Sequence, residues 1–185
     1  MNDAACNILI VKKRRTLWLR LVEAVVITVT ASVLAAAQSL PQVRLDADGL
    51  APRPIEELTA TTILHTYSLA WSSLATTLES GGPERLGEQF VGAAKDRLVR
   101  RVNEQNQTGV HVRILDHGHQ LKAIFYSTDG TAMQLVDTAQ LEIQTFDGSR
   151  LIDTQSVPHQ YVVLMTPGAD RWYVRDLQEV SQKSF

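Results

Sequence analysis

Apolar residues recur at three- and four-residue steps between residues 54 and 109, which is the spacing of one face of an α-helix. A first helix is predicted to begin at Pro54, because proline suits the first helical turn, and to end at Gly81 and Gly82. A second helix is predicted from Pro83 to the residue before Gly109. The two apolar stripes are Ile63, Tyr67, Ala70, Leu74 and Leu78, then Leu86, Phe90, Ala94, Leu98 and Val102.

After Gly109, apolar and polar residues alternate, and a period of two is typical of β-strands. Four turn signals divide the rest of the chain into five predicted strands, and tight turns between successive strands favour an antiparallel meander. The predicted fold class is α+β, with two helices packed on an antiparallel sheet of four to five strands. The turn signals are Asp116-His117-Gly118, Thr128-Asp129-Gly130, Phe146-Asp147-Gly148 and Pro167-Gly168-Ala169.

A basic cluster at 12–15 precedes an uncharged, Ala- and Val-rich stretch at 24–37. Positive charge resists translocation, so we expect the cluster to stay in the cytoplasm and the rest of the chain to cross the membrane. The stretch has 14 residues and reaches 21 only if Arg20 and Glu23 are included, whereas a spanning helix needs about 20. A retained anchor and a signal peptide cleaved after Ala37 both stay open, and a buried helix of a cytosolic protein is a third reading.

The stretch after the apolar segment is predicted to be a linker, because prolines, glycine and scattered charges follow one another without an apolar period. We expect the folded domain to begin at Pro54. The predicted organisation is a basic cytoplasmic segment (1–16), a transmembrane anchor or signal peptide (17–37), a linker (38–53), an α+β domain (54–180) and a tail (181–185).

The charge of the chain is concentrated in its amino-terminal segment. The whole sequence has 18 basic and 20 acidic residues, and removing everything up to Ala37 leaves 13 basic and 18 acidic residues. This acidic balance argues against a nucleic-acid partner. The single cysteine, Cys6, excludes a disulfide within the domain. The phosphate-loop, nucleophile-elbow, zinc and calcium signatures are absent from the sequence, so we expect no cofactor and no metal.

Asp137 lies on the apolar side of a predicted strand. A carboxylate on an apolar face is costly unless it is paired or hydrated. If the sheet encloses a cavity, Asp137 is a candidate general base. The alternatives are that a bulge turns Asp137 outward or that it pairs with an arginine. The residues that share its side of the strand are Met133, Leu135, Ala139, Leu141 and Ile143.

His159 and Tyr161 share one side of another predicted strand with apolar residues, and both are candidates to face the same cavity as Asp137. The alternative is that they are core residues whose polar ends are satisfied. Pro158 predicts an edge strand or a bulge at this point, since proline cannot donate a hydrogen bond to a neighbouring strand.

Three histidines, His111, His117 and His119, lie close together around Asp116. They bracket a predicted tight turn and lack a further ligand from a rigid element, whereas zinc requires three or four convergent ligands. We therefore interpret this segment as a solvated hairpin tip, without a metal.

The order of these elements, with Tyr67-Ser68-Leu69-Ala70-Trp71 on the first helix and Arg171-Trp172-Tyr173-Val174 in the last strand, resembles the nuclear transport factor 2-like superfamily. The resemblance covers residues 54 to 180 and implies a curved, cone-like sheet. Its members include small isomerases and dehydratases, some with an aspartate or histidine as the base in the cone. They also include ligand-binding modules and non-enzymatic periplasmic domains behind one membrane helix, and the layout of this chain is most similar to that last group.

These features favour a non-enzymatic binding or assembly module outside the cytoplasm, with a protein partner or a homo-oligomer and with the membrane contacted through the amino-terminal helix. The alternative is a small isomerase- or dehydratase-like enzyme, or a carrier of a small-molecule ligand, with Asp137 in the cone. A cytosolic adaptor is a third hypothesis. The sequence does not identify the ligand or the partner.

Overall fold

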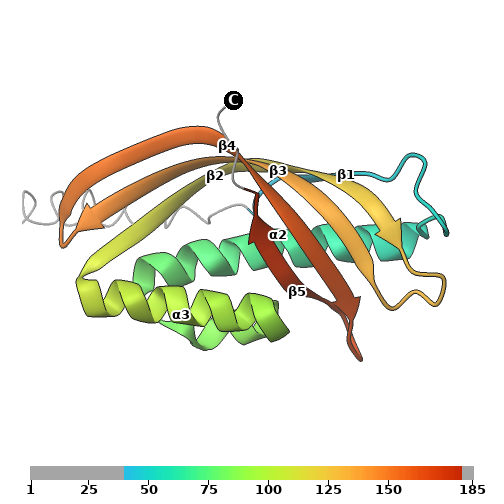
Figure 1. The fold of residues 1–185 in the computed structure, drawn as a ribbon, viewed down its shortest axis with the longest axis horizontal. Helices are drawn as coiled ribbons and strands as arrows, with labels where there is room; N and C mark the ends of the chain where they lie inside the picture. The colour runs from blue at the N-terminus through green and yellow to red at the C-terminus, as the bar shows by residue number, and fades with distance from the viewer. Residues whose placement is uncertain (1–39, 181–185) are drawn as a thin grey trace, which may run out of the picture. The chain divides into compact units, whose positions relative to one another are not determined.

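Helices cover one face of a five-stranded sheet (Figure 1). The structure is a computed structural model and describes residues 40–180. The predicted α+β class is confirmed. The elements in chain order are β1 (Val43–Asp46), α2 (Glu57–Ser80), the 3-10 helix η1 (Pro83–Glu88), α3 (Gly92–Thr108), β2 (Val110–Tyr126), β3 (Met133–Asp147), β4 (Arg150–Pro167) and β5 (Trp172–Glu179).

The sheet is mixed, which corrects the prediction of a purely antiparallel one. Its strand order is β1-β2-β3-β4-β5; β2 to β5 are antiparallel neighbours, whereas β1 is parallel to β2. β1 comes from the segment 38–53, which the sequence predicted to be a linker, so the compact unit begins at Leu40. Four residues are too few to show a period, and β1 is held by a strand more than 70 residues away, as the pairing of Val43 with His119 shows.

The predicted turn at Asp116-His117-Gly118 is wrong, because β2 runs through it without a break. The register with β3 shifts between Asp116 and His119, so two residues of β2 stand opposite one residue of β3, which is a β-bulge. Gly118 has φ +122° and its amide donates to Oδ1 of Asp116 at 2.8 Å. The composition of a turn and that of a bulge are similar because both need a glycine with unusual φ. Four strands therefore follow Gly109 instead of five.

The second predicted helix is divided into η1 and α3. Between them, Val91 donates its amide to the carbonyl of Val174, and Val174 donates to Gln89, at 3.0 and 2.9 Å. The chain at Phe90 thereby forms an isolated bridge with β5. Glycines at 87 and 92 weaken a helix here, and Gly92 has φ +54°. Nevertheless, every residue of both predicted apolar stripes is buried in the core.

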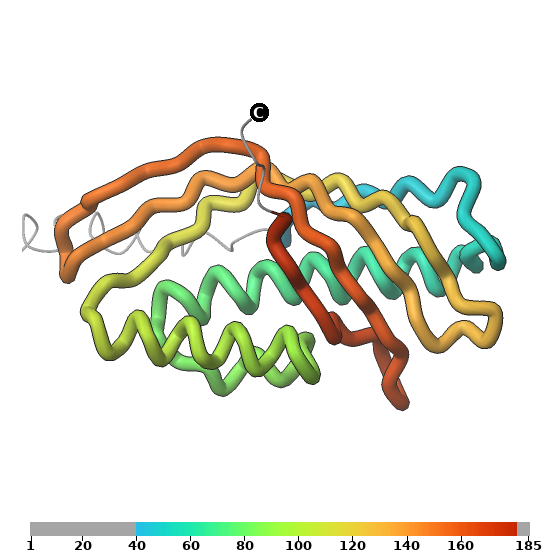
Figure 2. The backbone as a smooth tube through the Cα atoms, in the orientation of Figure 1, coloured from blue at the N-terminus to red at the C-terminus, as the bar shows by residue number. Residues whose placement is uncertain are grey.

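The strands arch over the helices (Figure 2), and the core fills the space between them. Core side chains come from the inward faces of α2, η1, α3 and β2 to β5. Within residues 40–180, no helix is both long enough and apolar enough to cross a membrane. The predicted cytoplasmic segment, the predicted membrane or signal segment (17–37) and the predicted tail lie outside the described residues.

The carboxyl end of α3 depends on the backbone conformation of Gly109. Gly109 has φ +71°, its amide donates to the carbonyl of Gln105 at 2.9 Å, and no atom lies within 4 Å of the position that a Cβ would occupy. The cost of a side chain is therefore the left-handed backbone alone. We expect Gly109→Ala to lower the free energy of unfolding by about 1 kcal/mol in urea titrations, and Gly109→Asn to cost less, because asparagine tolerates this conformation. Equal stability of all three proteins would contradict this account of the cap.

Candidate functional site

A cluster of four polar side chains lies between α2 and the sheet, and we call it the His119 network: Tyr67, Asp116, His119 and Asp137. The hydroxyl of Tyr67 donates to Oδ2 of Asp137 at 2.8 Å. Nδ1 of His119 lies 2.7 Å from the same Oδ2, and its Nε2 lies 2.9 Å from Oδ2 of Asp116. Oδ1 of Asp137 is also buried and has no hydrogen-bond partner within residues 40–180. One carboxylate thus joins the helix to two strands.

The sequence builds this cluster through three local patterns. Helical spacing puts Tyr67 on the apolar face of α2, and alternation along β3 puts Asp137 on the face that α2 covers. In β2 the bulge changes which residues face inward, so Asp116 before the bulge and His119 after it share the covered face. Without the extra residue, one of them would point away from the other.

The electrostatics of the cluster favour a charged imidazole. Burial alone lowers the pKa of His119, but hydrogen bonds to Asp116 and Asp137, together with their charges, outweigh burial and raise the pKa from 6.5 to about 9. His119 is therefore an imidazolium at neutral pH, with both ring nitrogens donating. Burial, and next the charge of Asp137, raise the pKa of Tyr67 well above 10, so its hydroxyl stays protonated and donates.

Aromatic rings enclose the imidazolium. The Trp71 ring centroid lies 4.6 Å from that of His119, and the Tyr67 ring stands edge-on to it at 5.5 Å. A cation close to the ring of a tryptophan is stabilised by the ring's quadrupole. Tyr161 also packs against Trp71, with centroids 5.2 Å apart. The charge is thus separated from water by packed side chains: the side chains of His119 and Asp137 have no exposed area.

Asp137 occupies the apolar face that the sequence predicted for it, but its partners differ from both alternatives. It is neither turned outward nor paired with an arginine; it binds Tyr67 and His119. Tyr161 lies directly opposite Asp137 in the β3–β4 register, without a hydrogen bond to it. Burial, and then the charge of Glu179, raise the pKa of Tyr161.

His159 lies two residues before Tyr161 on β4, opposite Ala139, and its Nδ1 is 2.7 Å from Oε1 of Glu179. The structure therefore brings Tyr161 next to Asp137 and places His159 in a separate pair with β5. Pro158 pairs with Gln140 on one side only, within the described residues, which confirms the predicted edge.

Sequence reasoning missed His119 as a partner of Asp137, although a signal was present. Counting back by two from the apolar residues Ala123 and Leu121 reaches His119 on the same face of the strand. The predicted turn at 116–118 hid this continuity. His117, in contrast, is exposed. Within residues 40–180, no group of three or more His, Cys, Asp or Glu side chains is arranged to hold a metal ion.

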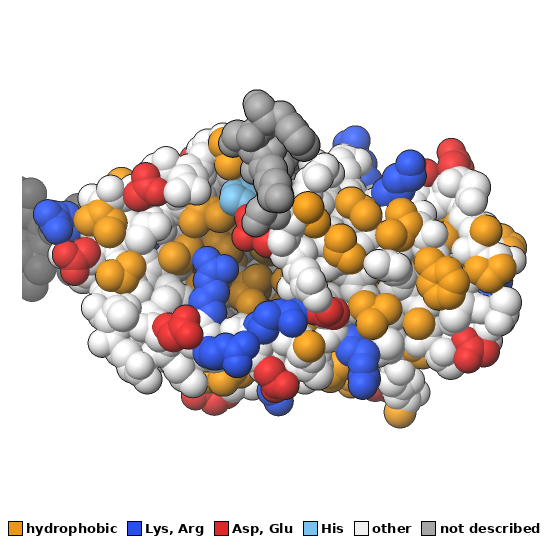
Figure 3. Space-filling model, in the orientation of Figure 1, with side chains coloured by type: hydrophobic (Ala, Val, Ile, Leu, Met, Phe, Trp, Pro, Cys, Tyr) orange, Lys and Arg blue, Asp and Glu red, His pale blue; other side chains and the backbone are white. Residues whose placement is uncertain are grey.

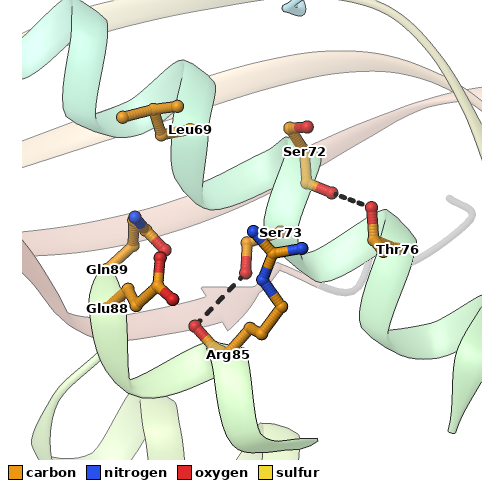
Figure 4. A pocket seen from close by; sticks show the side chains of 7 residues that line it. All are labelled: Leu69, Ser72, Ser73, Thr76, Arg85, Glu88 and Gln89. Carbon is orange, nitrogen blue, oxygen red and sulfur yellow. Dashed lines mark hydrogen bonds between the residues drawn. The ribbon is translucent and has the colours of Figure 1, made fainter. Parts of the chain in front are cut away.

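A small pocket of about 110 Å³ opens between α2 and η1, away from the His119 network (Figure 4). Two hydroxyls there donate to backbone carbonyls: Thr76 donates to Ser72 at 2.9 Å, and Ser73 donates to Arg85 at 3.4 Å. These bonds stabilise α2 and join it to η1. The pocket is lined by Leu69, Ser72, Ser73, Thr76, Arg85, Glu88 and Gln89.

A second hollow is visible in the space-filling view, beside α3 and β5, with hydrophobic side chains at its floor and Lys or Arg side chains at its edge (Figure 3). Arg97 of α3 binds Asp176 and the carbonyl of Leu177, both of β5. Because Asp137 has no exposed area, its carboxylate does not reach this hollow.

Family models and curated proteins gave no match to the sequence. Solved structures did. The intermembrane-space region of the chloroplast protein ARC6 aligns with a TM-score of 0.58 and 16% identity, over 70% of this chain and 98% of that one. The chain has the nuclear transport factor 2-like fold. At this identity the likeness concerns the fold alone.

Two further solved structures are less similar. A proposed scytalone dehydratase from Novosphingobium aromaticivorans has a TM-score of 0.48 and 11% identity, over 68% of this chain and 89% of that one. A proposed dehydratase of the nuclear transport factor 2-like family from Streptomyces avermitilis has a TM-score of 0.43 and 11% identity, over 64% of this chain and 96% of that one. The resemblance in the sequence is confirmed at the level of the fold.

Proposed function

We propose that this chain is a non-enzymatic binding and assembly module, held at the membrane or exported by its amino-terminal segment, with its domain outside the cytoplasm. The observation that supports the proposal most is the enclosure of Asp137. A general base must come within about 2.6 to 3.2 Å of the proton that it removes. Asp137 has no exposed area, and its Oδ2 already accepts from Tyr67 and lies against His119.

The His119 network is better suited to a structural role. Buried polar groups that satisfy one another fix the relative position of the elements that carry them. Here an ionised histidine between two carboxylates joins β2 to β3, and Tyr67 joins both strands to α2. Such a network rigidifies the domain so that its outer surface keeps one shape.

The surface and the leader support the assembly role. The first half of β4 exposes the apolar side chains Leu151, Ile152 and Val157, which are about half accessible. Exposed apolar residues along one strand are candidates for a contact site. ARC6 provides an example of this fold in an intermembrane space. The basic cluster and the apolar stretch of the leader favour a domain that lies across a membrane from the cytoplasm.

The proposal is tested in cells that express the full chain with a carboxy-terminal tag. A photo-reactive amino acid replaces Val157 on β4, and the matched control replaces Gln107, an exposed residue of α3. We expect the tag to be accessible from outside the cytoplasm and position 157 to form a discrete covalent adduct with protein on irradiation, with a weaker adduct or none at position 107. A cytoplasmic tag, or no adduct at either position, would overturn the proposal.

A further inference from the structure

The first half of β4 has one unpaired edge. β3 pairs with β4 from Arg150 to Met165, whereas β5 pairs only with the segment from Tyr161 to Pro167. Within residues 40–180, no strand lies against the other edge of 150–158, and every residue in this stretch is exposed. Figure 1 shows β4 extending well past the end of β5. The strand is therefore open over nine residues.

The direction of the backbone groups at this edge follows from one hydrogen bond. Val180, just after β5, donates its amide to the carbonyl of Gln160 at 2.8 Å, so the backbone groups of Gln160 point away from β3. This direction alternates along a strand, and Ser156 and Thr154 therefore also point outward. Pro158 falls in the same set, as it must, because it has no N–H to donate to β3. The outward amides of Thr154 and Ser156 face solvent.

Two of the features that protect edge strands are present, Pro158 and a β-bulge at Ile152, but residues 153–157 between them form regular strand. Lysines, inward-pointing charges or a covering element normally prevent another strand from adding to a sheet. Between 150 and 158 the charged residues are Arg150 and Asp153, one of each sign, and Leu151, Ile152 and Val157 are 50%, 50% and 53% accessible. An exposed edge with apolar residues and no net charge is a template for strand addition.

We propose that this edge binds the same edge of a second copy of the chain, antiparallel, with the twofold axis at Thr154. The inference rests on the proposed assembly function and names its partner. With this axis the central pairs, Thr154 with Thr154 and Asp153 with Gln155, lie on the regular part of the edge between the bulge at Ile152 and Pro158. The two sheets become one continuous sheet. The backbone N–H of each Thr154 then donates to the carbonyl of the Thr154 in the other copy.

The charges select this partner and this register. With the axis at Thr154, Asp153 faces Gln155 of the second copy, and the amide of Gln155 already reaches the Asp153 carboxylate within one strand, at 2.9 Å. An axis at Asp153 would set two carboxylates opposite each other, which destabilises a sheet. An axis at Gln155 would set Pro158 of one copy opposite the bulge at Ile152 of the other, so two irregular positions, one of them without an N–H, would face each other inside the ladder.

A cysteine at the axis tests the register. Residues opposite each other in a hydrogen-bonded pair have Cα atoms about 5.5 Å apart, within the range that a disulfide spans. We expect the full-length Cys6→Ser/Thr154→Cys double variant to form a covalent dimer under mild oxidation, and the matched Cys6→Ser/Gln107→Cys variant to stay monomeric. If the disulfide formed at position 154 no faster than at position 107, the proposal would be overturned.

A charge exchange at the same exposed position tests the pairing without a covalent bond. Thr154→Lys and Thr154→Glu each place like charges across the axis, so each alone should dimerise about fivefold more weakly than the wild type in sedimentation experiments. A one-to-one mixture of the two should restore dimers that contain one copy of each. Dimerisation that is unchanged in the single variants, or a mixture that stays as weak as they are, would contradict the twofold at Thr154. Unchanged circular dichroism confirms that the variants are folded.

The failure of this inference and the failure of the proposed function give different results. If the Cys6→Ser/Thr154→Cys variant does not couple while the photo-reactive residue at position 157 captures a different protein outside the cytoplasm, the self-pairing is wrong and the assembly function stands. If position 157 captures nothing and the tag is cytoplasmic, both are wrong. If a segment of the same chain covers the edge, the adduct at position 157 is intramolecular and the self-pairing is likewise overturned.

Discussion

Replacing Asp137 by alanine should lower the free energy of unfolding by about 3 to 5 kcal/mol, because it leaves a buried cation without one of its two partners. The substitution removes the carboxylate that lies 2.7 Å from His119 and 2.8 Å from the hydroxyl of Tyr67. Tyr67 also loses its acceptor inside the core. Urea titration of the full chain at pH 7, followed by circular dichroism, measures the loss.

The matched control is Asp48→Ala, which removes an exposed carboxylate from the turn after β1 and should change stability by less than about 0.5 kcal/mol. Tyr67→Phe keeps the ion pair and removes one donor, so its expected cost is smaller, about 1 to 3 kcal/mol. If Asp137→Ala cost no more than Asp48→Ala, Asp137 would be a solvated carboxylate, and the structural role of the network would be wrong.

The stability of the domain should fall as the pH rises from about 6.5 to 9. The folded-state pKa of His119, about 9, lies above its ordinary value of 6.5. The stabilisation is therefore fully present below pH 6.5 and is lost as the pH rises through 9, with a total of about 3 kcal/mol. Tyr67 does not titrate in this range, because its pKa is raised well above 10.

Urea titrations at pH 6 and pH 9.5 measure this loss, and the control is His119→Gln, which has no ionisable group at this position. We expect the variant to be less stable than the wild type at pH 6 and nearly independent of pH over the same range. A wild-type stability that is constant or rises from pH 6 to 9.5 would show that the histidine is not held as a cation by its two carboxylates.

The sequence allowed most of the helical layer to be predicted, because its elements are long and periodic. The stripes from Ile63 to Leu78 and from Leu86 to Val102 are buried as expected. The division of the second helix was missed because it depends on a contact of Phe90 with β5, more than 80 residues away. Helical spacing alone contains no information about such a contact.

The sheet was predicted in its order but not in its details. β1 is too short for a periodic signal, and it pairs with a strand far along the chain. The bulge at 116–118 has the composition of a turn, and only the register between β2 and β3 distinguishes the two. This one feature determined whether the candidate site could be found, since it brings Asp116 and His119 to the same face. Asp137 was identified from its apolar neighbours, but its partners lie 18 and 70 residues away.

A nitrogen-15 NMR titration of the His119 ring shows whether the cluster around Asp137 is a closed structural network. We expect both ring nitrogens to be protonated at pH 7 and His119 to titrate with a pKa of about 9. Signals of a neutral imidazole at pH 7, with a pKa near the ordinary 6.5, would contradict it: the aspartates would not hold a cation, and the cluster would be open to acid–base chemistry with a ligand.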